Sequence, residues 1–364
     1  MRLLVLLLAL LAASPATAQA PPAPRVRTLL TATGPITAFA QNGHFVAWAS
    51  AEPATSRCSM LVRIRDLSRG YQNAVTDAAG DTCRSDLLVS RLALALSAKG
   101  SREDARALWL RYEAGNNQYW YLSTASLDSP HERRVADLIY PSSSEVRVSL
   151  VGAGPLLAYA WSAAGVVDEN DCLATGLQCP FRVLDGGEVR VGVGLDAPQP
   201  QIPPSSSAAL FGQRGYGRLA LLVRGHLGDD TTPNAPLHDI EVRNPSSPGP
   251  PIGRFSATRP IRAIAVSSNT VAVLTDRAIE RYTTSGTLRA TSLVPATTAP
   301  ELSISTTGIV YHVGRSIRVV GRGQVAVAAS APIGLSIDGR RVAWAENVHV
   351  GSALVGRVRA LDLP

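Results

Sequence analysis

The chain has 364 residues, of which 46% are hydrophobic and 17% are charged, so its composition suits a folded core and excludes a disordered chain. The formal net charge is +7, yet Lys99 is the only lysine and the arginines are scattered singly along the chain. No basic run with interleaved aromatic residues is present, so the charge does not indicate a nucleic-acid-binding surface.

Residues 1–18 have the pattern of a secretory signal peptide. A positive charge at Arg2 is followed by a leucine-rich run and then by small residues at Ala16 and Ala18. We expect cleavage after Ala18, because a cut two residues later would place Pro21 directly beside the scissile bond. The apolar run is too short to span a bilayer comfortably.

The rest of the chain is expected to be a Pro/Ala-rich linker over residues 19–24 and a single domain over residues 25–364. No later stretch has the length and hydropathy of a membrane helix. We therefore expect a monomer that is soluble after signal cleavage, without a stable membrane span. It is expected to be secreted or to reside in the periplasm or cell envelope.

Pairs of short apolar strands recur along this domain. The first pair, ITAFAQNGHFVAWAS, begins at Ile36 and has an Asn-Gly turn at residues 42–43. The last pair, GLSIDGRRVAWAEN, begins at Gly334 and has an Asp-Gly turn at residues 338–339. Both second strands carry the triplet Val-Ala-Trp, so the two segments are copies of one repeat.

Five further copies lie between these two ends. Their first strands begin near Leu92, Val146, Ala208, Ile261 and Leu302. A third strand and usually a fourth follow each pair, as in AIERYTT with LRATSLV and SIRVVG with QVAVAAS. Units of four short strands that recur at roughly 30 to 60 residues are typical of the blades of a β-propeller. The sequence thus predicts an all-β, seven-bladed β-propeller.

The last unit lacks one strand. It offers GLSID, RVAWAE and GRVRALDL before the chain ends, whereas VRTLLTA from Val26 precedes the first unit and has no partner there. We expect this N-terminal strand to pair beside residues 357–363 and to complete the seventh blade, which removes an exposed sheet edge.

The repeat resembles those of the TolB-type and WD40-like β-propeller proteins. Their pattern is a strand, then Ser-Pro-Asp-Gly, then an apolar strand that ends in an aromatic residue. The best match is SIDG at residues 336–339 followed by VAW at residues 342–344, and the second is the Asn-Gly turn at residues 42–43 with Trp48. The resemblance extends over nearly the whole chain after the signal peptide. It implies the architecture alone and identifies no catalytic residue.

The four cysteines of an exported chain indicate two disulfide bonds. Three pairings are possible, and Cys58 with Cys83 and Cys172 with Cys179 close the shortest loops. A propeller would place both members of each pair on loops of the same face. Since no Cys-x-x-Cys motif is present, we expect structural bridges and no redox catalysis.

Two acidic insertions follow the second strands of adjacent units and are expected on that same face. The candidate ligand or metal residues are Asp168, Glu169, Asp171, Asp229, Asp230, His238 and Asp239. Clustered oxygen ligands of this kind suit calcium. Two solvated acidic loops are the simpler interpretation and the favoured one, because neither insertion matches an EF-hand or a nonapeptide calcium motif. No other cofactor is indicated.

The sequence contains none of the common catalytic motifs, such as a nucleophile elbow, a zinc-protease motif or a phosphate-binding loop. The leading hypothesis is therefore a non-catalytic module that binds a protein, a peptide or a glycan through its loop-rich face. One alternative is a propeller hydrolase or lyase that uses carboxylates at the channel mouth, such as Asp171 and Asp230, with calcium. A third is a structural component of the cell envelope.

Overall fold

A computed structural model shows how the repeats are arranged. It describes residues 25–51, 60–75, 92–95, 105–113, 118–140, 146–163, 182–185, 188–190, 205–213, 216–223, 238–245, 250–296 and 301–364. All the regular secondary structure within these residues is β-strand, and the strands form seven antiparallel sheets of four strands each. The predicted all-β class is thus confirmed.

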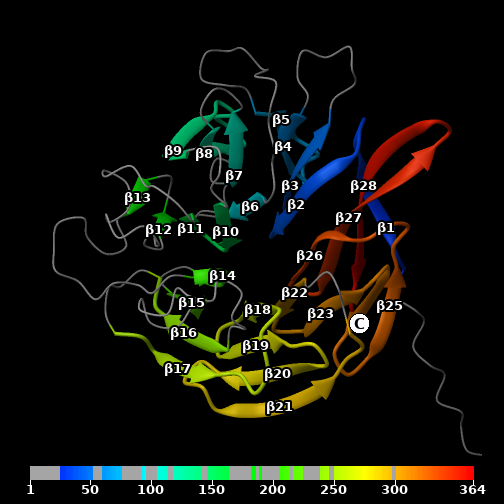
Figure 1. Ribbon diagram of the computed structural model, residues 1–364. Helices are drawn as coiled ribbons and strands as arrows, with labels where there is room; N and C mark the ends of the chain where they lie inside the picture. The colour runs from blue at the N-terminus through cyan, green and yellow to red at the C-terminus, as the bar shows by residue number, and fades with distance from the viewer. Residues whose placement is uncertain are drawn as a thin grey trace, which may run out of the picture.

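Six of the sheets are built from consecutive strands, in sequence order from the centre of the molecule to its rim (Figure 1). The first sheet contains β2 (Ile36–Asn42), β3 (Phe45–Ala51), β4 (Met60–Asp66) and β5 (Gln72–Ala74). The second contains β6 (Leu92–Ala95), β7 (Arg106–Glu113), β8 (Gln118–Ser126) and β9 (Arg133–Tyr140). The third contains β10 (Val146–Ala153), β11 (Leu156–Ala163), β12 (Arg182–Asp185) and β13 (Glu188–Arg190).

The next three sheets repeat this pattern. The fourth contains β14 (Ser205–Gln213), β15 (Tyr216–Val223), β16 (Asp239–Arg243) and β17 (Gly253–Ser256). The fifth contains β18 (Ala263–Val266), β19 (Thr270–Leu274), β20 (Ala278–Thr283) and β21 (Leu288–Leu293). The sixth contains β22 (Leu302–Ser305), β23 (Gly308–Val313), β24 (Ser316–Val319) and β25 (Gly323–Val327).

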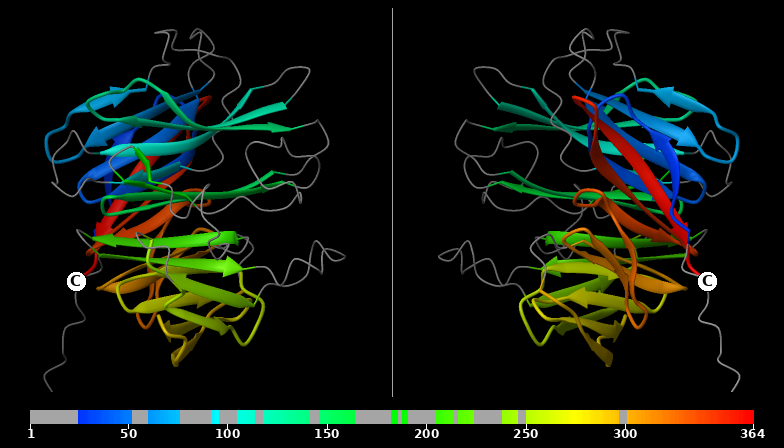
Figure 2. Two further views of the ribbon diagram at one scale, coloured as in Figure 1. Left: turned by 90° about the vertical axis from the view of Figure 1, so that its left-hand side faces the viewer. Right: turned by 90° about the vertical axis from the view of Figure 1, so that its right-hand side faces the viewer.

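The seventh sheet combines the two ends of the domain. It contains β26 (Ile333–Asp338), β27 (Arg341–Val350) and β28 (Ala353–Asp362), and its outermost strand is β1 (Arg27–Thr31). Arg27 lies opposite Ala360, and Thr31 lies opposite Arg357. The predicted pairing of the N-terminal strand with the C-terminal segment is therefore confirmed (Figure 2).

The hairpin of this sheet is longer than the sequence predicts. The expected second strand ended near Glu346 and the expected third strand began near Gly356, but β27 and β28 remain paired as far as Val350 and Ala353. Gly351, with φ of 61°, occupies the tight turn between them. The Val-rich segment on either side of this turn favours extension of the ladder.

The seven sheets are arranged around a common centre. The first strand of each sheet contacts the first strands of the two neighbouring sheets, and the cycle runs from β2 through β6, β10, β14, β18, β22 and β26 back to β2. In Figure 1 these strands lie nearest the middle, and the fourth strands form the rim. This is the arrangement of a β-propeller.

The two tryptophans of the Val-Ala-Trp triplets pack between sheets. Trp344 is fully buried in a cluster that includes Val310 of the sixth sheet, and Trp48 is 2% exposed in a cluster that includes Val358 of the seventh. A large flat side chain buries much apolar area in such a position. Each triplet thus packs its own sheet against the preceding one.

No helix in the part of the chain described by the structure is long and apolar enough to cross a bilayer.

Candidate functional site

One face of the ring is formed by the turns between the first and second strands, at residues 43–44, 154–155, 267–269, 306–307 and 339–340; we call it the turn face. Its turns are tied to one another across sheet boundaries. The backbone N–H of Gly43 donates a hydrogen bond to Asp338 Oδ2, which joins the first sheet to the seventh. The Ser305 hydroxyl donates to the carbonyl oxygen of Gly339 at 2.7 Å, which joins the sixth sheet to the seventh.

Three more links continue these contacts through the other sheets. Asn42 Nδ2 donates to the carbonyl oxygen of Gly154 at 3.0 Å, and the Tyr216 hydroxyl donates to that of Ser268 at 2.9 Å. A Cβ at Gly154 would lie 2.0 Å from the carbonyl oxygen of Gly212, so the third and fourth sheets approach each other backbone to backbone. Six of the seven sheets are thereby linked at the turn face.

We call the opposite face the connector face. It carries the segments that join one sheet to the next and the segments that join second strands to third strands. Their ends lie side by side. The N–H of Ala51, at the end of β3, donates to the carbonyl oxygen of Pro35, just before β2, at 2.9 Å. In the fifth sheet the N–H of Arg262 donates to the carbonyl oxygen of Leu274 at 2.7 Å. The predicted grouping of these segments on one face is therefore seen in both sheets.

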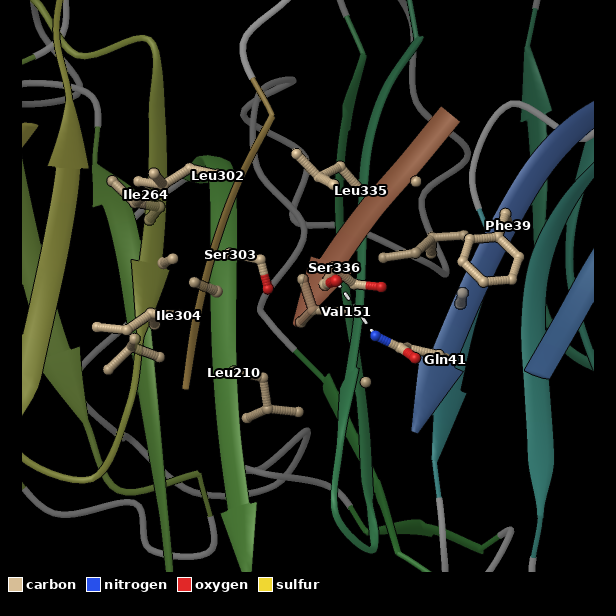
Figure 3. Close-up of a pocket in the computed structure, with 17 residues that line it drawn as sticks. Phe39, Gln41, Val151, Leu210, Ile264, Leu302, Ser303, Ile304, Leu335 and Ser336 are labelled. Atoms are coloured by element: carbon tan, nitrogen blue, oxygen red, sulfur yellow. Dashed lines mark hydrogen bonds between the residues drawn. The ribbon is translucent and has the colours of Figure 1, made fainter. Parts of the chain in front are cut away.

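A pocket of about 260 Å³ lies at the centre of the ring, between the first strands of six sheets (Figure 3). Most of the residues that line it have aliphatic or aromatic side chains, and backbone groups of the first strands are also exposed to it. The lining residues are Phe39, Ala40, Gln41, Leu150, Val151, Gly152, Ala209, Leu210, Ile264, Ala265, Val266, Leu302, Ser303, Ile304, Gly334, Leu335 and Ser336. None of these residues carries a charge. β2, β10 and β18 contribute residues near the ends that lead into the turn face.

Gln41 joins β2 to the seventh sheet. Its side chain is 8% exposed, and its Nε2 donates to the carbonyl oxygens of Ser336 and Arg341, both at 3.2 Å. Its Oε1 accepts a hydrogen bond from Arg341 Nε at 3.1 Å. Because both ends of the amide already have partners, Gln41 acts as a structural link in the pocket wall.

On its other side, β26 is held by the sixth sheet. The Glu301 carboxylate accepts hydrogen bonds from the N–H groups of Gly334 and Leu335, at 3.1 and 2.8 Å. Ser303 Oγ accepts one from the N–H of Ile337 at 3.1 Å. An innermost strand has no neighbouring strand on its channel side, so side chains from the adjacent sheet serve backbone groups that no ladder pairs.

A buried histidine lies beside this carboxylate. The side chain of His312 is 2% exposed, its Nδ1 is 2.9 Å from the carbonyl oxygen of Gly314, and its Nε2 is 3.8 Å from Glu301 Oε2. With the proton placed on Nδ1, the ring donates to the backbone and turns Nε2 toward Glu301. In this tautomer Nε2 forms no hydrogen bond within the described residues, so His312 is buried beside Glu301 without holding β26, and it is not among the residues that line the pocket.

Ser336 brings an unused polar group to the pocket wall. Its Oγ is buried and forms no hydrogen bond within the described residues. A buried hydroxyl without a partner costs about 1 to 3 kcal/mol. Among the polar side chains that line the pocket, Ser336 is consequently the one that forms no hydrogen bond within the described residues.

Two buried glutamates lie outside the pocket, at equivalent positions of the third strands. Glu241 accepts from Arg243 Nε and, at 2.8 Å, from Arg254 Nε. Glu280 accepts from the hydroxyls of Thr258 and Tyr282. Each carboxylate therefore has partners inside or beside its own sheet, as expected for a structural role.

Of the candidate ligand residues, the structure describes two. Asp239 is exposed at the start of β16, and its Oδ1 accepts a hydrogen bond from the Ser256 hydroxyl at 2.6 Å. The carbonyl oxygen of His238 accepts from the N–H of Ala257 at 2.8 Å. Among the described residues, no three His, Cys, Asp or Glu side chains gather as they would around a metal ion.

The other site predictions lie outside the described residues: Asp168, Glu169, Asp171, Asp229, Asp230, Cys58, Cys83, Cys172 and Cys179. They remain predictions of the sequence.

Sequence reasoning did not identify the pocket. Its wall and supports, among them Gln41, Ser303 and Ser336, come from repeats far apart in the chain, and no spacing links them. The usable signal is their shared position, since each lies on a predicted first strand. Superposition of the repeats would therefore have gathered them at the channel.

No protein-family model matches the chain, and no curated protein sequence matches it. Solved structures do. The β-propeller domain of the Trilobed protease from Pyrococcus furiosus is 12% identical, with 91% of this chain and 94% of that chain covered and a TM-score of 0.46. Hsv2 of Kluyvelomyces marxianus is 9% identical, with 90% and 98% covered and a TM-score of 0.43.

The acylaminoacyl peptidase of Pyrococcus horikoshii is 11% identical to the chain, with a TM-score of 0.48. The match covers 90% of this chain but only 51% of the peptidase. The similarity to all three proteins is one of fold.

Proposed function

We propose that the protein is an exported, seven-bladed β-propeller, completed by β1, that binds a protein, a peptide or a glycan through its connector face. The observation that carries the proposal is the asymmetry between the two faces. Side-chain and backbone hydrogen bonds tie the turn face across sheet boundaries, as between Gly43 and Asp338. The sequence predicts that its longest insertions, at residues 164–181 and 224–237, belong to the connector face.

A rigid ring with variable loops on one side suits recognition. Binding orders the groups at an interface, and a frame that is already fixed lowers this cost. The hydrogen bonds of the sheets and of the turn face hold the frame together. Loops on such a scaffold can differ in sequence without loss of the fold. The chemistry of the partner follows from the loops and not from the fold.

The proposal is tested by selection of ligands followed by face-specific substitution. The purified exported protein is screened against a peptide library and a glycan array, and each ligand is then titrated by calorimetry. Arg277→Glu changes an exposed residue of the connector face, where the side chain is 76% exposed. Thr306→Glu introduces the same charge at an exposed position of the turn face.

We expect Arg277→Glu to weaken binding of a ligand that covers the fifth sheet by roughly tenfold, and Thr306→Glu to leave it unchanged. For ligands that lie elsewhere on the connector face, glutamate is introduced at further exposed connector positions. Ligands that respond only to turn-face substitutions would contradict the proposal.

The proposal keeps calcium as the alternative to two solvated acidic loops, at the segments that contain Asp168, Glu169, Asp171, Asp229 and Asp230. Thermal unfolding is compared in excess calcium and in excess chelator. Bound calcium raises the melting temperature by mass action, so identical melting curves would remove calcium from the proposal.

A further inference from the structure

From the β27–β28 hairpin we infer which kind of partner the connector face takes. It is an extended segment of another protein, with apolar residues at alternate positions, that adds to the free edge of β27 as a further strand. The inference rests on the function proposed above, because it names the partner of that face. The docking element is the stretch of residues 347–356, which we call the overhang.

The overhang extends past both neighbouring strands of its sheet. The pairing of β27 with β26 ends at Ala345, and the pairing of β28 with β1 begins at Arg357. β27 and β28 nevertheless stay paired as far as Val350 and Ala353, and in Figure 1 their hairpin projects beyond the rest of the seventh sheet. It joins a second strand to a third, so it belongs to the connector face. A two-stranded ribbon is marginally stable by itself, and a third strand would stabilise it.

The β27 edge of the overhang offers free backbone groups. The N–H of Asn347 points away from β28, because it donates to Ser330 Oγ at 2.9 Å. Gly356, which lies opposite Asn347, likewise directs its N–H away from β27, to the carbonyl oxygen of Gly34. The alternation of hydrogen bonds along an antiparallel pair then directs the N–H and C=O of His349 to the same edge as those of Asn347. No strand of the described structure lies beside His349 there, so a donor and an acceptor are open to an added strand.

The overhang also lacks the features that usually protect an exposed strand edge, which are charged side chains, prolines and bulges. Its sequence, NVHVGSALVG, contains no Asp, Glu, Lys, Arg or Pro. Its two strands pair without a shift of register. An edge of this kind is a template for another strand.

One face of the overhang is apolar throughout. Val348 and Val350 lie on the same side of β27 as Glu346, since side chains alternate along a strand. The residues opposite them on β28 are Val355 and Ala353. Val350 is 51% exposed, and Ala353 is exposed as well. An added strand with apolar side chains on this side would remove both from water.

The apolar surface continues at the foot of the overhang. The N–H of Ala329 donates to Glu346 Oε2 at 2.8 Å, so the segment of residues 329–331 lies beside the start of the overhang. Ala329 and Ala331 are both exposed. A strand on the β27 edge would therefore lie over this segment.

The size of the overhang favours another protein over a second copy of this chain. Four residues of a strand extend about 14 Å, so two overhangs that pair edge to edge bury only short segments. A stable interface buries about 1,200 to 2,000 Å². A segment of another protein can continue from the overhang across the connector face and add the contacts that two overhangs lack.

The experiment uses three peptides of the same length, acetylated and amidated at their ends, on the purified exported protein. The first, Thr-Val-Ser-Val-Ser-Val-Thr, places its valines on one face of a strand. The second has serine in place of each valine, and the third is the valine peptide with every backbone nitrogen methylated. Binding is measured by calorimetry. We expect the valine peptide to bind and the other two to bind at least about tenfold more weakly, because one lacks apolar side chains and the other lacks N–H donors.

No binding of the valine peptide would overturn the inference, as would a methylated peptide that binds as tightly as its parent. Failure here is distinguishable from failure of the proposed function. In the first case, ligands from the peptide library and the glycan array still respond to substitutions on the connector face, and in the second they do not.

Variants locate the site on the overhang. Val350→Lys places a charge on the apolar face and should weaken binding of the valine peptide by roughly tenfold. Ala353→Lys does the same from β28 and serves if the first variant does not fold. Leu354→Lys is the matched control, because its side chain is 39% exposed on the opposite face of the hairpin. Unchanged binding by a folded Val350→Lys protein, or an equal loss in Leu354→Lys, would overturn the inference.

Sedimentation velocity of the protein without peptide tests the second copy as the occupant. We expect the unmodified protein and Val350→Lys to sediment alike, as monomers. A dimer that Val350→Lys dissociates would show that the overhang binds another copy of the chain, and it would overturn the inference.

Discussion

Several residues at the junction of the first and seventh sheets make close contacts between the two sheets. Asn347 on β27 accepts a hydrogen bond from the N–H of Ile36 at 2.7 Å and donates one to its carbonyl oxygen at 2.9 Å. Gly356 on β28 donates from its N–H to the carbonyl oxygen of Gly34 at 2.9 Å. The two sheets thus meet through backbone contacts that leave no space for a larger side chain at Gly356.

Gly356→Ala is expected to destabilise the protein by about 1 to 3 kcal/mol, the usual cost of overpacking a core. An added Cβ would lie 2.4 Å from Ile36 Cγ1 and 2.9 Å from the Ile36 backbone nitrogen. Urea unfolding gives the free energy change. Gly308→Ala is the matched control, because its nearest contact would be 3.4 Å away; equal losses in the two variants would contradict the steric explanation.

Asp66 shows how a single turn can make stability depend on pH. The residue is fully buried at the end of β4, and its Oδ1 accepts hydrogen bonds from the N–H and hydroxyl of Ser68, at 2.8 and 2.6 Å, and from the N–H of Arg69. Burial by itself would raise the pKa of Asp66, but these hydrogen bonds and the nearby His44 outweigh it and the pKa is lowered.

A lowered pKa in the folded state means that the ionised carboxylate stabilises the fold. This contribution is complete above the unfolded pKa of about 3.9 and is lost as the pH falls through the lower folded pKa. Asp66→Asn should lower stability at pH 7 by about 1 to 3 kcal/mol and reduce the loss of stability in acid. Urea titrations between pH 7 and pH 2 measure both effects.

Asp362→Asn is the control for that series, because Asp362 is half exposed and its ion pair with Arg27 contributes less than about 1 kcal/mol. If the stability of Asp66→Asn followed the same pH curve as that of the unmodified protein, the role assigned to the Asp66 carboxylate would be wrong.

At the scale of the elements, the outermost strands share a feature that limits unwanted pairing. Their registers with the third strands are interrupted in four sheets, at β1, β9, β21 and β25. An irregularity of this kind twists an edge strand and disturbs its row of free backbone groups. At these four edges the rim of the ring is thus a poor template for another strand.

β1 should be needed for a stable seventh sheet. Leu30 on this strand is 7% exposed and belongs to a cluster with Trp48 and Val358, so Leu30→Asp places a charge in the core. We expect a loss of about 2 to 5 kcal/mol and increased aggregation, since β28 would become an open edge. Thermal unfolding and light scattering measure these effects.

Thr28→Asp places the same charge at an exposed position of β1 and should change stability by less than about 0.5 kcal/mol. Similar behaviour of the two variants would mean that β1 is not held through its buried face.

For the molecule as a whole, the ring brings together the starts and ends of repeats that are distant in the chain. The sheet-to-sheet clusters are built largely from Ala, Val, Leu and Ile, as in the cluster that unites the fourth and fifth sheets. Small and branched side chains allow sheets to pack closely around a centre. The low aromatic content of the chain is compatible with this packing, because only a few positions between sheets hold a tryptophan.

The two disulfide bonds are a prediction at this scale. In the exported protein we expect Cys58 to be bonded to Cys83 and Cys172 to Cys179, so that each bond closes a connector segment. Peptide mapping without reduction identifies the pairs. Reduction should lower the melting temperature, since each cross-link restricts the unfolded chain. A bond between Cys58 and either Cys172 or Cys179 would show that the shortest-loop pairing is wrong.

Much of the architecture followed from the sequence by itself, because its determinants are local. Alternating apolar residues and the Asn-Gly and Asp-Gly turns define the strands, and the count of strands in the last repeat predicts the partner of β1. The length of the β27–β28 hairpin did not follow: the valines beside Gly351 favour a strand, but the sequence pattern does not show how far the pairing of β27 with β28 continues.

The central pocket was decided by the tertiary structure alone. Gln41, Ser303 and Ser336 lie in three different repeats, and only the cyclic packing of the first strands brings them to one place. Sequence patterns record which face of a strand is buried, but not which backbone groups remain unpaired at the centre of a ring. The side chains that satisfy those groups, and the hydroxyl that is left over, are properties of the assembled sheets.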